Sequence, residues 1–280
     1  ALSNELCSVG VQAYLPTLIT TGETDFLKRL KAIRCATETL PKSRDMIIGV
    51  HLEGPAISYK DGPRGAHPKQ HIRPASISEF KRLQKAANGL IKLITIAPET
   101  EGSHRYIKYL TSKGIIVSLG HSDADELEIT QAVDAGAQMS THLGNGISDN
   151  LKRHPNAIWA QLAEDRLTAS FIADSHHLPK SALKAMLRAK GIERSILVSD
   201  SVKFAGLPAG RYSSEIGGKI DVSKEGRISI AETAYLAGSG SCLLDIISAF
   251  PNFTGMPLKD AVIMASNNPA KLLGVTNNLT

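Results

Sequence analysis

The stretch IIVSLGHSDADELEITQAVDAG (residues 115–136) decides the fold class, because its periodicity changes halfway. Residues 115–119 form a short apolar run rich in β-branched side chains, which is typical of a strand buried in a parallel sheet. Residues 125–136 repeat apolar side chains at steps of three and four, and the segment ends on a Gly. The stretch therefore predicts a strand followed by a helix, with His121 at their junction.

The same unit recurs along the chain. The apolar runs predicted as strands are VQAYLPTLIT (11–20), MIIGVHLEG (46–54), LIKLITIAPE (90–99), IIVSLGHSD (115–123), QMSTHLGN (138–145), LTASFIADSHH (167–177) and SILVSDS (195–201). Between them, helical periodicity covers residues 24–40, 77–89, 125–136 and 178–191. This alternation is typical of βαβ units, so we predict an α/β fold, specifically a (β/α)8 TIM-like barrel.

Length and the last third of the chain refine this fold. A chain of 280 residues suits one large barrel, and we treat residues 1–280 as a single domain. Residues 210–230 carry Gly and polar turn signals between short alternating runs, which predicts a β-hairpin insertion after the last barrel strand. Residues 258–275 are predicted as a helix, a polar break and a further helical turn.

Charge and cysteine usage exclude several classes of protein. The net charge is +5, but the Lys and Arg residues are dispersed, so we expect an anionic small molecule such as a phosphate ester and no nucleic acid. Three widely spaced cysteines imply no disulfide framework and fit a reducing cytoplasm. No apolar stretch approaches the roughly 18 residues that span a bilayer, and we expect no membrane segment.

Polar side chains follow the apolar runs where the predicted strands end: Glu53, His121, His142 and Asp200. In a (β/α) barrel the carboxyl ends of all strands meet at one mouth, so these side chains are expected to form one site. Imidazole and carboxylate groups are the usual ligands of catalytic zinc. We therefore predict a divalent metal, best matched by zinc, on Glu53, His121 and His142.

Asp200 is the candidate general base. A bound metal lowers the pKa of its water toward about 7, and a neighbouring carboxylate can then accept the proton. On position alone, Asp200 is equally well explained as a helix N-cap or a turn residue. The presence of His121, His142 and Glu53 at other strand ends favours the catalytic interpretation.

Several blocks also resemble a known family. They are YLPTLITT, HLEGP with the downstream RGAHP, SLGHSDA, STHLGNGI, IADSHH and LVSDS, in this order. N-acetylglucosamine-6-phosphate deacetylases of the amidohydrolase superfamily carry similar blocks in the same order. The resemblance covers nearly the whole chain and implies the hydrolysis of acetate from an amino sugar 6-phosphate.

The resemblance also implies roles for individual residues. Glu53, His121 and His142 match the family's metal ligands, and Asp200 matches the group that deprotonates the attacking water and then protonates the leaving amine. His67, in RGAHP, matches a histidine that polarises the acetyl carbonyl. From the residues alone, a loop histidine explains His67 as well.

Four further positions match substrate contacts: Asn145, Gly146, Arg153 and His177. At Asn145 and Gly146 backbone amides approach the substrate, and Arg153 matches a phosphate-binding arginine that reaches across a homodimer interface. His177 matches a sugar-contacting histidine, although its neighbour His176 is an alternative at one residue's distance. Glu99 and Asp174 are left outside this list as groups that could orient others.

The family's first barrel strand has no counterpart in this sequence, and neither do the flanking strands of its small β-domain. Some members bind a second metal through that strand, so one or two ions are expected. Two other functions are open: an amidohydrolase acting on another N-acyl or cyclic amide, and a non-catalytic relative that binds sugar phosphates.

Overall fold

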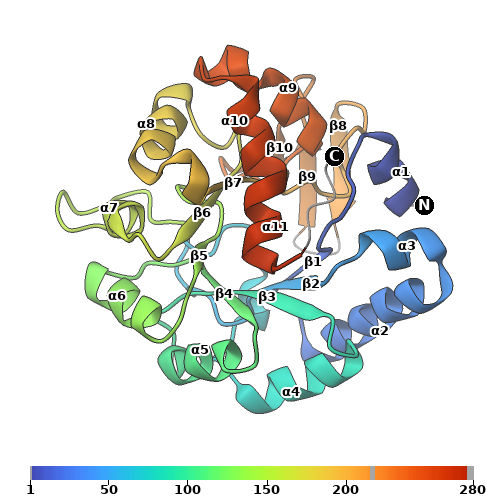
Figure 1. Ribbon diagram of the computed structural model, residues 1–280, viewed down its shortest axis with the longest axis vertical. Helices are drawn as coiled ribbons and strands as arrows, with labels where there is room; N and C mark the ends of the chain where they lie inside the picture. Colours follow the sequence, from blue (N-terminus) through green and yellow to red (C-terminus); the bar gives the residue numbers. More distant parts are fainter. Residues whose placement is uncertain (1, 215–217, 276–280) are drawn as a thin grey trace.

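A curved sheet of seven parallel strands forms the frame of the protein (Figure 1). The structure is a computed structural model that describes residues 2–214 and 218–275. In order of hydrogen bonding the strands are β1 (Thr17–Ile19), β2 (Val50–Glu53), β3 (Ile91–Ile96), β4 (Ile116–Leu119), β5 (Met139–Ser140), β6 (Thr168–Phe171) and β7 (Ser195–Leu197). Each strand lies within one of the seven predicted apolar runs, so the parallel α/β prediction is confirmed.

Helices cover the outer face of this sheet (Figure 1). They are α1 (Leu2–Ser8), α2 (Glu23–Thr39), α3 (Pro41–Met46), α4 (Ile77–Ala86), α5 (Ser103–Thr111), α6 (Glu126–Asp134), α7 (Ala157–Ala163) and α8 (Lys180–Lys190), with short turns η1 (Lys69–His71) and η2 (Ile192–Arg194). Helices α2, α4, α6 and α8 coincide with the four segments of helical periodicity.

Local chemistry starts these helices where the sequence predicts. The Ser76 hydroxyl accepts a hydrogen bond from the backbone N–H of Glu79 at the start of α4. Asp125 and Glu128 form a reciprocal capping box at the start of α6. The apolar face of each helix then packs on the sheet, for example Phe80 and Leu83 of α4 against the strands β2 to β4.

After β7 the chain leaves the parallel sheet and builds a small antiparallel one. Its strands are β8 (Gly210–Ser214), β9 (Gly218–Val222) and β10 (Ile228–Ile230), in the order β10-β9-β8. A sheet after the last barrel strand was predicted, but as a two-stranded hairpin. The third strand pairs Ile228 with Val222, and this pairing buries both side chains beside Ile220.

The chain then returns to the sheet through α9 (Leu243–Thr254), α10 (Leu258–Val262), η3 (Ile263–Asn267) and α11 (Asn268–Leu273). The predicted polar break within residues 258–275 is a single π-helical turn, η3, that leaves the helix uninterrupted. Asn268 anchors this segment, because its side-chain amide donates to the carbonyl oxygens of Ile192 and Ser195, both at 2.7 Å.

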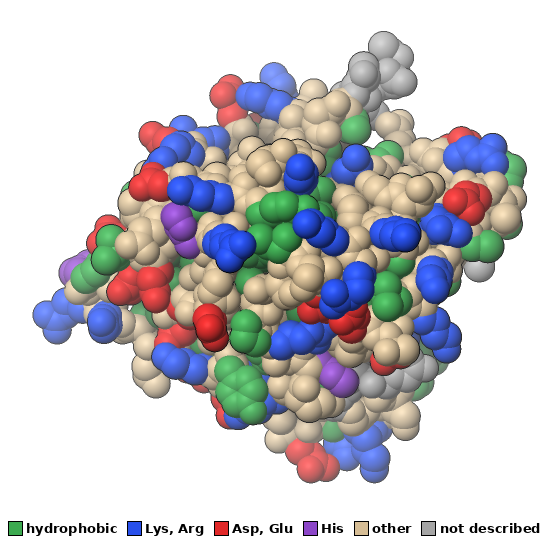
Figure 2. Space-filling model, turned by 90° about the horizontal axis from the view of Figure 1, so that it is seen from below, with side chains coloured by type: hydrophobic (Ala, Val, Ile, Leu, Met, Phe, Trp, Pro, Cys, Tyr) green, Lys and Arg blue, Asp and Glu red, His purple; other side chains and the backbone are tan. Residues whose placement is uncertain are grey.

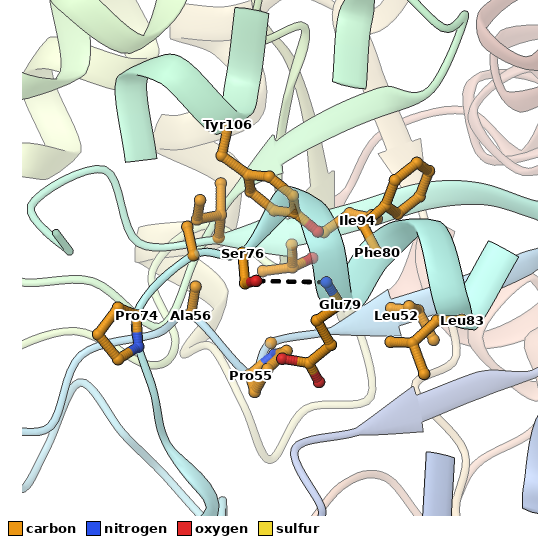
Figure 3. Close-up of a pocket in the computed structure, with 14 residues that line it drawn as sticks. Leu52, Pro55, Ala56, Pro74, Ser76, Glu79, Phe80, Leu83, Ile94 and Tyr106 are labelled. Atoms are coloured by element: carbon orange, nitrogen blue, oxygen red, sulfur yellow. Dashed lines mark hydrogen bonds between the residues drawn. The ribbon is translucent and has the colours of Figure 1, made fainter. Parts of the chain in front are cut away.

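A cavity of about 10 Å³ lies between α4 and the outer face of β2 and β3 (Figure 3). It is lined by side chains such as Leu52, Phe80, Ile94 and Tyr106, and its volume suffices for about one water molecule. It is therefore a gap in the packing and not a substrate site.

On the face seen in Figure 2, Lys and Arg side chains are dispersed among acidic and neutral ones. Within the part of the chain that the structure describes, no helix is long and apolar enough to cross a membrane.

Candidate metal centre

Four candidate residues lie at the carboxyl ends of parallel strands. Glu53 is the last residue of β2, His121 and His142 each stand two residues beyond β4 and β5, and Asp200 stands three residues beyond β7. His67 reaches the same end of the sheet from the long loop after β2. The sequence expectation that strand ends form a common site therefore has a structural counterpart.

The backbone is strained at three of these positions. The φ angle is +51° at His121, +28° at His142 and +48° at Asp200, in the left-handed region that non-glycine residues rarely adopt. Each such residue costs on the order of 1–3 kcal/mol and persists only where its surroundings enforce it. The strain turns each side chain at the strand end and marks these positions as functional candidates.

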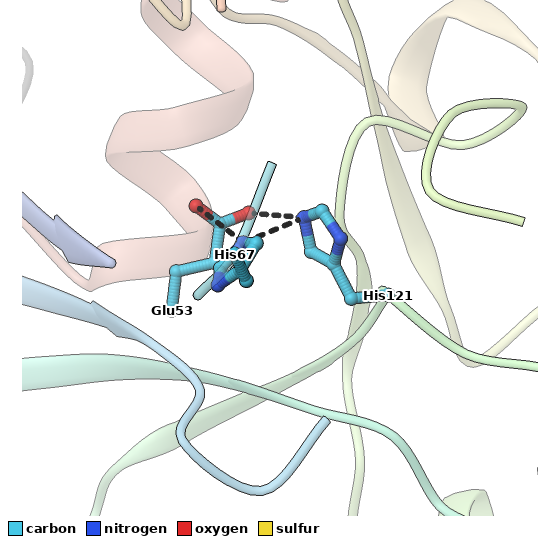
Figure 4. A group of neighbouring side chains, drawn as sticks. All are labelled: Glu53, His67 and His121. Atoms are coloured by element: carbon cyan, nitrogen blue, oxygen red, sulfur yellow. Dashed lines mark hydrogen bonds and ion pairs between the residues drawn. The ribbon is translucent and has the colours of Figure 1, made fainter. Parts of the chain in front are cut away.

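Figure 4 shows the side chains of Glu53, His67 and His121 pointing toward one another, and His142 joins them. His121 Nε2 lies 3.0 Å from Glu53 Oε1, 3.1 Å from His142 Nε2 and 3.2 Å from His67 Nε2. His142 Nε2 also lies 3.1 Å from Glu53 Oε1. All four residues are buried. Tetrahedral zinc with bonds of about 2.0–2.1 Å places its ligand atoms about 3.3 Å apart, which is close to these separations.

The outer nitrogens of two rings show which inner nitrogens are free to bind a cation. His121 Nδ1 lies 3.0 Å from the carbonyl oxygen of Pro63, so it must donate, and Nε2 of the neutral ring carries a lone pair. The Thr20 hydroxyl donates to the carbonyl oxygen of Glu53 and so accepts from His67 Nδ1 at 2.9 Å. Two lone pairs and a carboxylate thus face one another, an arrangement that a cation stabilises.

Electrostatics keeps Glu53 charged. Burial alone would raise the pKa of Glu53, but interactions with the imidazoles of His121 and His142 hold it well below its ordinary value. Positive charge on this side of the carboxylate, from a proton or from a bound cation, has the same effect. Burial and the neighbouring His121 hold the pKa of His67 well below its ordinary value, so its ring is neutral. Burial lowers the pKa of His142, but the Glu53 carboxylate raises it by more, so the net change is an increase. A metal that binds His142 must therefore compete with a proton.

The donor set therefore fits a divalent metal, but it offers two choices for the third ligand. Glu53 and His121 belong to both. His142 was predicted from the sequence, and its Nε2 is 3.1 Å from the carboxylate. His67 also places a nitrogen within 4.8 Å of both ligand atoms, although its Nε2 is 4.0 Å from Glu53 Oε2. Glu53 lies closer to His142, which favours the predicted set.

Asp200 borders this cluster from β7. Burial and the negative charge of Glu53 raise its pKa, His142 and His177 oppose the shift, and the net result is a pKa of about 6. The carboxylate is thus available as a proton acceptor near neutral pH.

The proposed substrate-binding residues differ in whether they contact the cluster of Glu53, His67, His121 and His142. Gly146 adjoins it, because a Cβ at Gly146 would lie 2.8 Å from His121 Nδ1. Asn145 bonds to the carbonyl oxygen of His142 through its side-chain amide at 3.2 Å. Arg153 is exposed in the loop before α7, and no hydrogen bond or ion pair joins its guanidinium to the described residues of the cluster.

His177 and His176 point in different directions. The His177 ring is buried and its Nδ1 lies 2.8 Å from Asp174 Oδ2. The His176 ring instead reaches the carbonyl oxygen of Glu225 beside the small sheet, at 3.2 Å.

Comparison with known proteins supplies the family. The chain is 36% identical over 276 residues to N-acetylglucosamine-6-phosphate deacetylase of Bacillus subtilis (strain 168), covering 98% of this chain and 68% of that protein. It is 32% identical to N-acetylgalactosamine-6-phosphate deacetylase of Escherichia coli O157:H7, covering 95% and 69%. The chain belongs to the N-acetylglucosamine-6-phosphate deacetylase family. No family model matches the chain.

Solved structures of the family share the fold. The N-acetylglucosamine-6-phosphate deacetylase of Thermotoga maritima superposes with a TM-score of 0.86 at 30% identity, over 97% of this chain and 72% of that one. A mutant of the Mycobacterium smegmatis enzyme, in complex with N-acetyl-D-glucosamine-6-phosphate, superposes with a TM-score of 0.85 at 30% identity, over 94% and 68%. The resemblance predicted from HLEGP and the other blocks is confirmed.

Proposed function

We propose that this protein removes acetate from N-acetylglucosamine 6-phosphate or a close epimer such as the galactosamine analogue. The observation that carries the proposal is the convergence of one buried carboxylate and three imidazoles at the strand ends of a chain in this family. Relatives named for both epimers match the chain, so the choice of epimer is left to experiment.

Glu53, His121 and His142 would hold the divalent cation, and zinc suits this ligand set best. When bound, the cation would act as a Lewis acid on the amide carbonyl and on water. One ion is consistent with the described residues, and we propose that number.

The chain's own side chains would then move the protons. Asp200 accepts a proton from the attacking water and returns it to the departing amine nitrogen. His67 would polarise the acetyl carbonyl by donating from Nε2. That role needs the tautomer opposite to the one inferred above, and the Thr20 hydroxyl permits it, because it can donate to His67 Nδ1 instead of to the Glu53 carbonyl.

Substrate recognition would involve the remaining candidates. His177 would bind a sugar hydroxyl, and backbone amides at Asn145 and Gly146 would approach the substrate. Arg153 would bind the 6-phosphate of the neighbouring subunit in a homodimer, where a guanidinium can donate two parallel hydrogen bonds. Exposure of Arg153 supports this assignment. We place the protein in the cytoplasm.

The curled sheet supports a (β/α)8 barrel as the complete architecture. Seven strands in consecutive order, helices on the outer face and candidate residues at the carboxyl ends are its recurring features. We infer that residues 1–280 form one such metal-dependent domain.

Acetate release is the direct test. The chain is stripped with a chelator, given Zn²⁺ again, and assayed with N-acetylglucosamine 6-phosphate, its galactosamine epimer and unphosphorylated N-acetylglucosamine. Zn²⁺-dependent release that is much faster with a 6-phosphate is expected. Activity only on another N-acyl or cyclic amide would support the alternative amidohydrolase, and binding of sugar phosphate without release would support a non-catalytic relative.

A further inference from the structure

The Asp174 carboxylate lies in a buried hydrogen-bond network beside the metal centre. Its side chain is only 1% exposed. Oδ1 accepts from the backbone N–H groups of His176 and His177, at 2.9 and 3.0 Å. Oδ2 accepts from His177 Nδ1 and from the Ser239 hydroxyl, each at 2.8 Å. Four donors therefore occupy both oxygens and keep the carboxylate ionised despite its burial.

One arm of this network orients His177. Because Asp174 Oδ2 accepts the Nδ1 proton, the ring plane is fixed and Nε2 is left for a ligand. His176, the residue before His177, donates only its backbone N–H to Asp174 and turns its ring to Glu225. Asp174 thus distinguishes the two neighbouring histidines.

The other arm reaches the backbone of Asp200. Ser239 is buried, and its N–H donates to the carbonyl oxygen of Asp200 at 2.9 Å. The Ser239 carbonyl in turn accepts from the N–H of Val202 at 3.2 Å. These two bonds flank Ser201, and the first of them holds the carbonyl group of Asp200, whose φ is +48°. A strained residue keeps its conformation only while its neighbours hold it.

We propose that Asp174 is a positioning residue that holds the sugar-facing imidazole of His177 and, through Ser239, the strained backbone of Asp200. This inference rests on the function proposed above. It assigns the hydrogen bond to His177 to substrate binding, and the hydrogen bond to Ser239 to proton transfer by Asp200. Both ties converge on a single oxygen atom, Oδ2.

Three variants separate the two arms. Ser239→Ala removes the hydroxyl that joins Asp174 to the segment bonded to Asp200, together with an acceptor for the Ser241 N–H, and keeps the backbone bond to Asp200. Without that anchor kcat should fall about 10-fold with KM unchanged. His177→Ala should raise KM. Asp174→Asn keeps the size but removes the charge, so kcat should fall and KM rise, each by about 10-fold or more, in the range known for groups that orient a site.

Double mutants give the decisive test. If Asp174 acts on kcat through Ser239, adding Ser239→Ala to Asp174→Asn should lower kcat no further. Likewise, the double variant Asp174→Asn/His177→Ala should have the same KM as His177→Ala alone. Independent, multiplying effects in both cycles would overturn the proposal.

A matched control reports on general destabilisation. Asn268→Ala also removes two buried hydrogen bonds from the β7 region, but at the start of that strand, away from Asp200. It should lower the melting temperature while leaving kcat and KM near wild type. Equal kinetic losses in Asn268→Ala would reduce Asp174 to a merely structural residue.

A readout without turnover separates this proposal from the proposed function. In histidine-labelled protein, the His177 Nδ1 proton should give an NMR signal that Asp174→Asn abolishes and Asn268→Ala retains. Amide exchange of Ser239 should accelerate in Asp174→Asn only. An inactive wild type with both signatures refutes the proposed function alone, whereas an active wild type without them refutes the positioning role.

Discussion

At the residue scale, the backbone is strained at His121, His142 and Asp200, and the strain is not explained by the residue types. A glycine would adopt their positive φ angles with less strain. Each instead carries an imidazole or a carboxylate toward one buried cluster. Since hydrophobic packing gains nothing from these side chains, we attribute the strain to the orientation that the site requires.

Asp200→Asn tests the proton acceptor. The variant keeps the shape of the side chain, so metal and substrate should still bind, while kcat falls by at least about 100-fold, the low end of general acid–base contributions. Asp134→Asn, an exposed substitution on α6, serves as the control and should keep full activity. Near-normal kcat in Asp200→Asn would transfer the role to another group, with His67 or Glu99 next to test.

The choice of third metal ligand is tested by His142→Ala and His67→Ala. His142→Ala should lose bound metal, because its nitrogen lies nearer the Glu53 carboxylate. His67→Ala should keep most metal and lose kcat. His104→Ala, on the exposed side of α5, is the control for removing an imidazole. Metal content after gel filtration decides, and retention in folded His142→Ala with loss in His67→Ala would exchange the two roles.

Sequence reasoning named the ionisable candidates that the structure brings together, and Asp174 as an orienting group, but not the hydroxyl groups that bond to them. Strand ends are recognisable from the apolar runs, so Glu53, His121 and His142 could be placed together before any coordinates. By contrast, Ser239 meets Asp174 across 65 positions, and Thr20 meets His67 across 47. Small hydroxyl residues in loops have no periodicity that would predict such long-range partners.

At the scale of elements, the strand and helix positions were predictable wherever one face is buried. The prediction was incomplete for the small antiparallel sheet, where β10 adds a third strand, and for the C-terminal helix, where a π turn replaces the expected break. In both places a tertiary contact decides the outcome: β10 shares a hydrophobic cluster with β9, and the end of the π turn leads into Asn268, which bonds to the start of β7.

The loop after β5 packs against His121, a proposed metal ligand, and Gly146→Ala tests this support. The added Cβ would meet His121 Nδ1 at 2.8 Å, and φ is +59°. The ring of His121 must therefore shift, and metal affinity should fall at least about 10-fold, as for other changes that disturb ligand orientation. Gly114→Ala has a comparable φ of +72° with open space around it and controls for backbone strain. Equal metal affinities in the two variants, measured by competition with a chelator, would contradict this role.

Lys190, the last residue of α8, ties that helix to α7. Its fully buried ammonium donates to the carbonyl oxygens of Gln161 and Glu164, at 2.8 and 2.7 Å. Lys190→Met removes both bonds, although the Glu164 carbonyl keeps its bond from the backbone N–H of Leu167 at 3.1 Å. The substitution should lower the free energy of unfolding by about 1–3 kcal/mol in denaturant titrations. Lys180→Met, on the exposed start of α8, should change it by less than about 0.5 kcal/mol.

The Lys190 effect should also depend on pH. Burial lowers the Lys190 pKa from 10.5 to about 8, so between these values the unfolded chain holds a proton that the folded chain has released. Stability from this group therefore rises with pH across that window. The difference between wild type and Lys190→Met should be larger at pH 9.5 than at pH 7.5. A smaller difference at pH 9.5 would show that the carbonyl oxygens hold the proton.

At the scale of the whole molecule, sheet curvature brings together residues from distant parts of the chain. Four strands lie between β2, which ends at Glu53, and β7, which precedes Asp200, yet the charge of Glu53 helps to raise the pKa of Asp200. Arg153 is the exception, because it stands exposed while its proposed ligand is the sugar phosphate. A second subunit would resolve this separation, as the homodimer proposal requires.

Mixing two impaired variants, assayed well below the KM of Arg153→Ala, distinguishes a phosphate contact across the interface from one within a subunit. Arg153→Ala alone should raise KM for the phosphorylated substrate and not for unphosphorylated N-acetylglucosamine, whereas the neighbouring Lys152→Ala should change neither. When Arg153→Ala and Asp200→Asn chains are mixed, each heterodimer regains one site that has an intact Asp200 and receives Arg153 from its partner.

Random reassortment of a homodimer gives half heterodimers, and each has one good site of two, so about a quarter of wild-type activity should return at wild-type KM. Sedimentation at the assay concentration must show a dimer that exchanges subunits. Activity equal to the mean of the two parents, in a mixture shown to contain heterodimers, would place Arg153 in its own subunit's site. A monomer with normal KM would remove the interface from the mechanism, since the exposed guanidinium would then have to reach the phosphate within one chain.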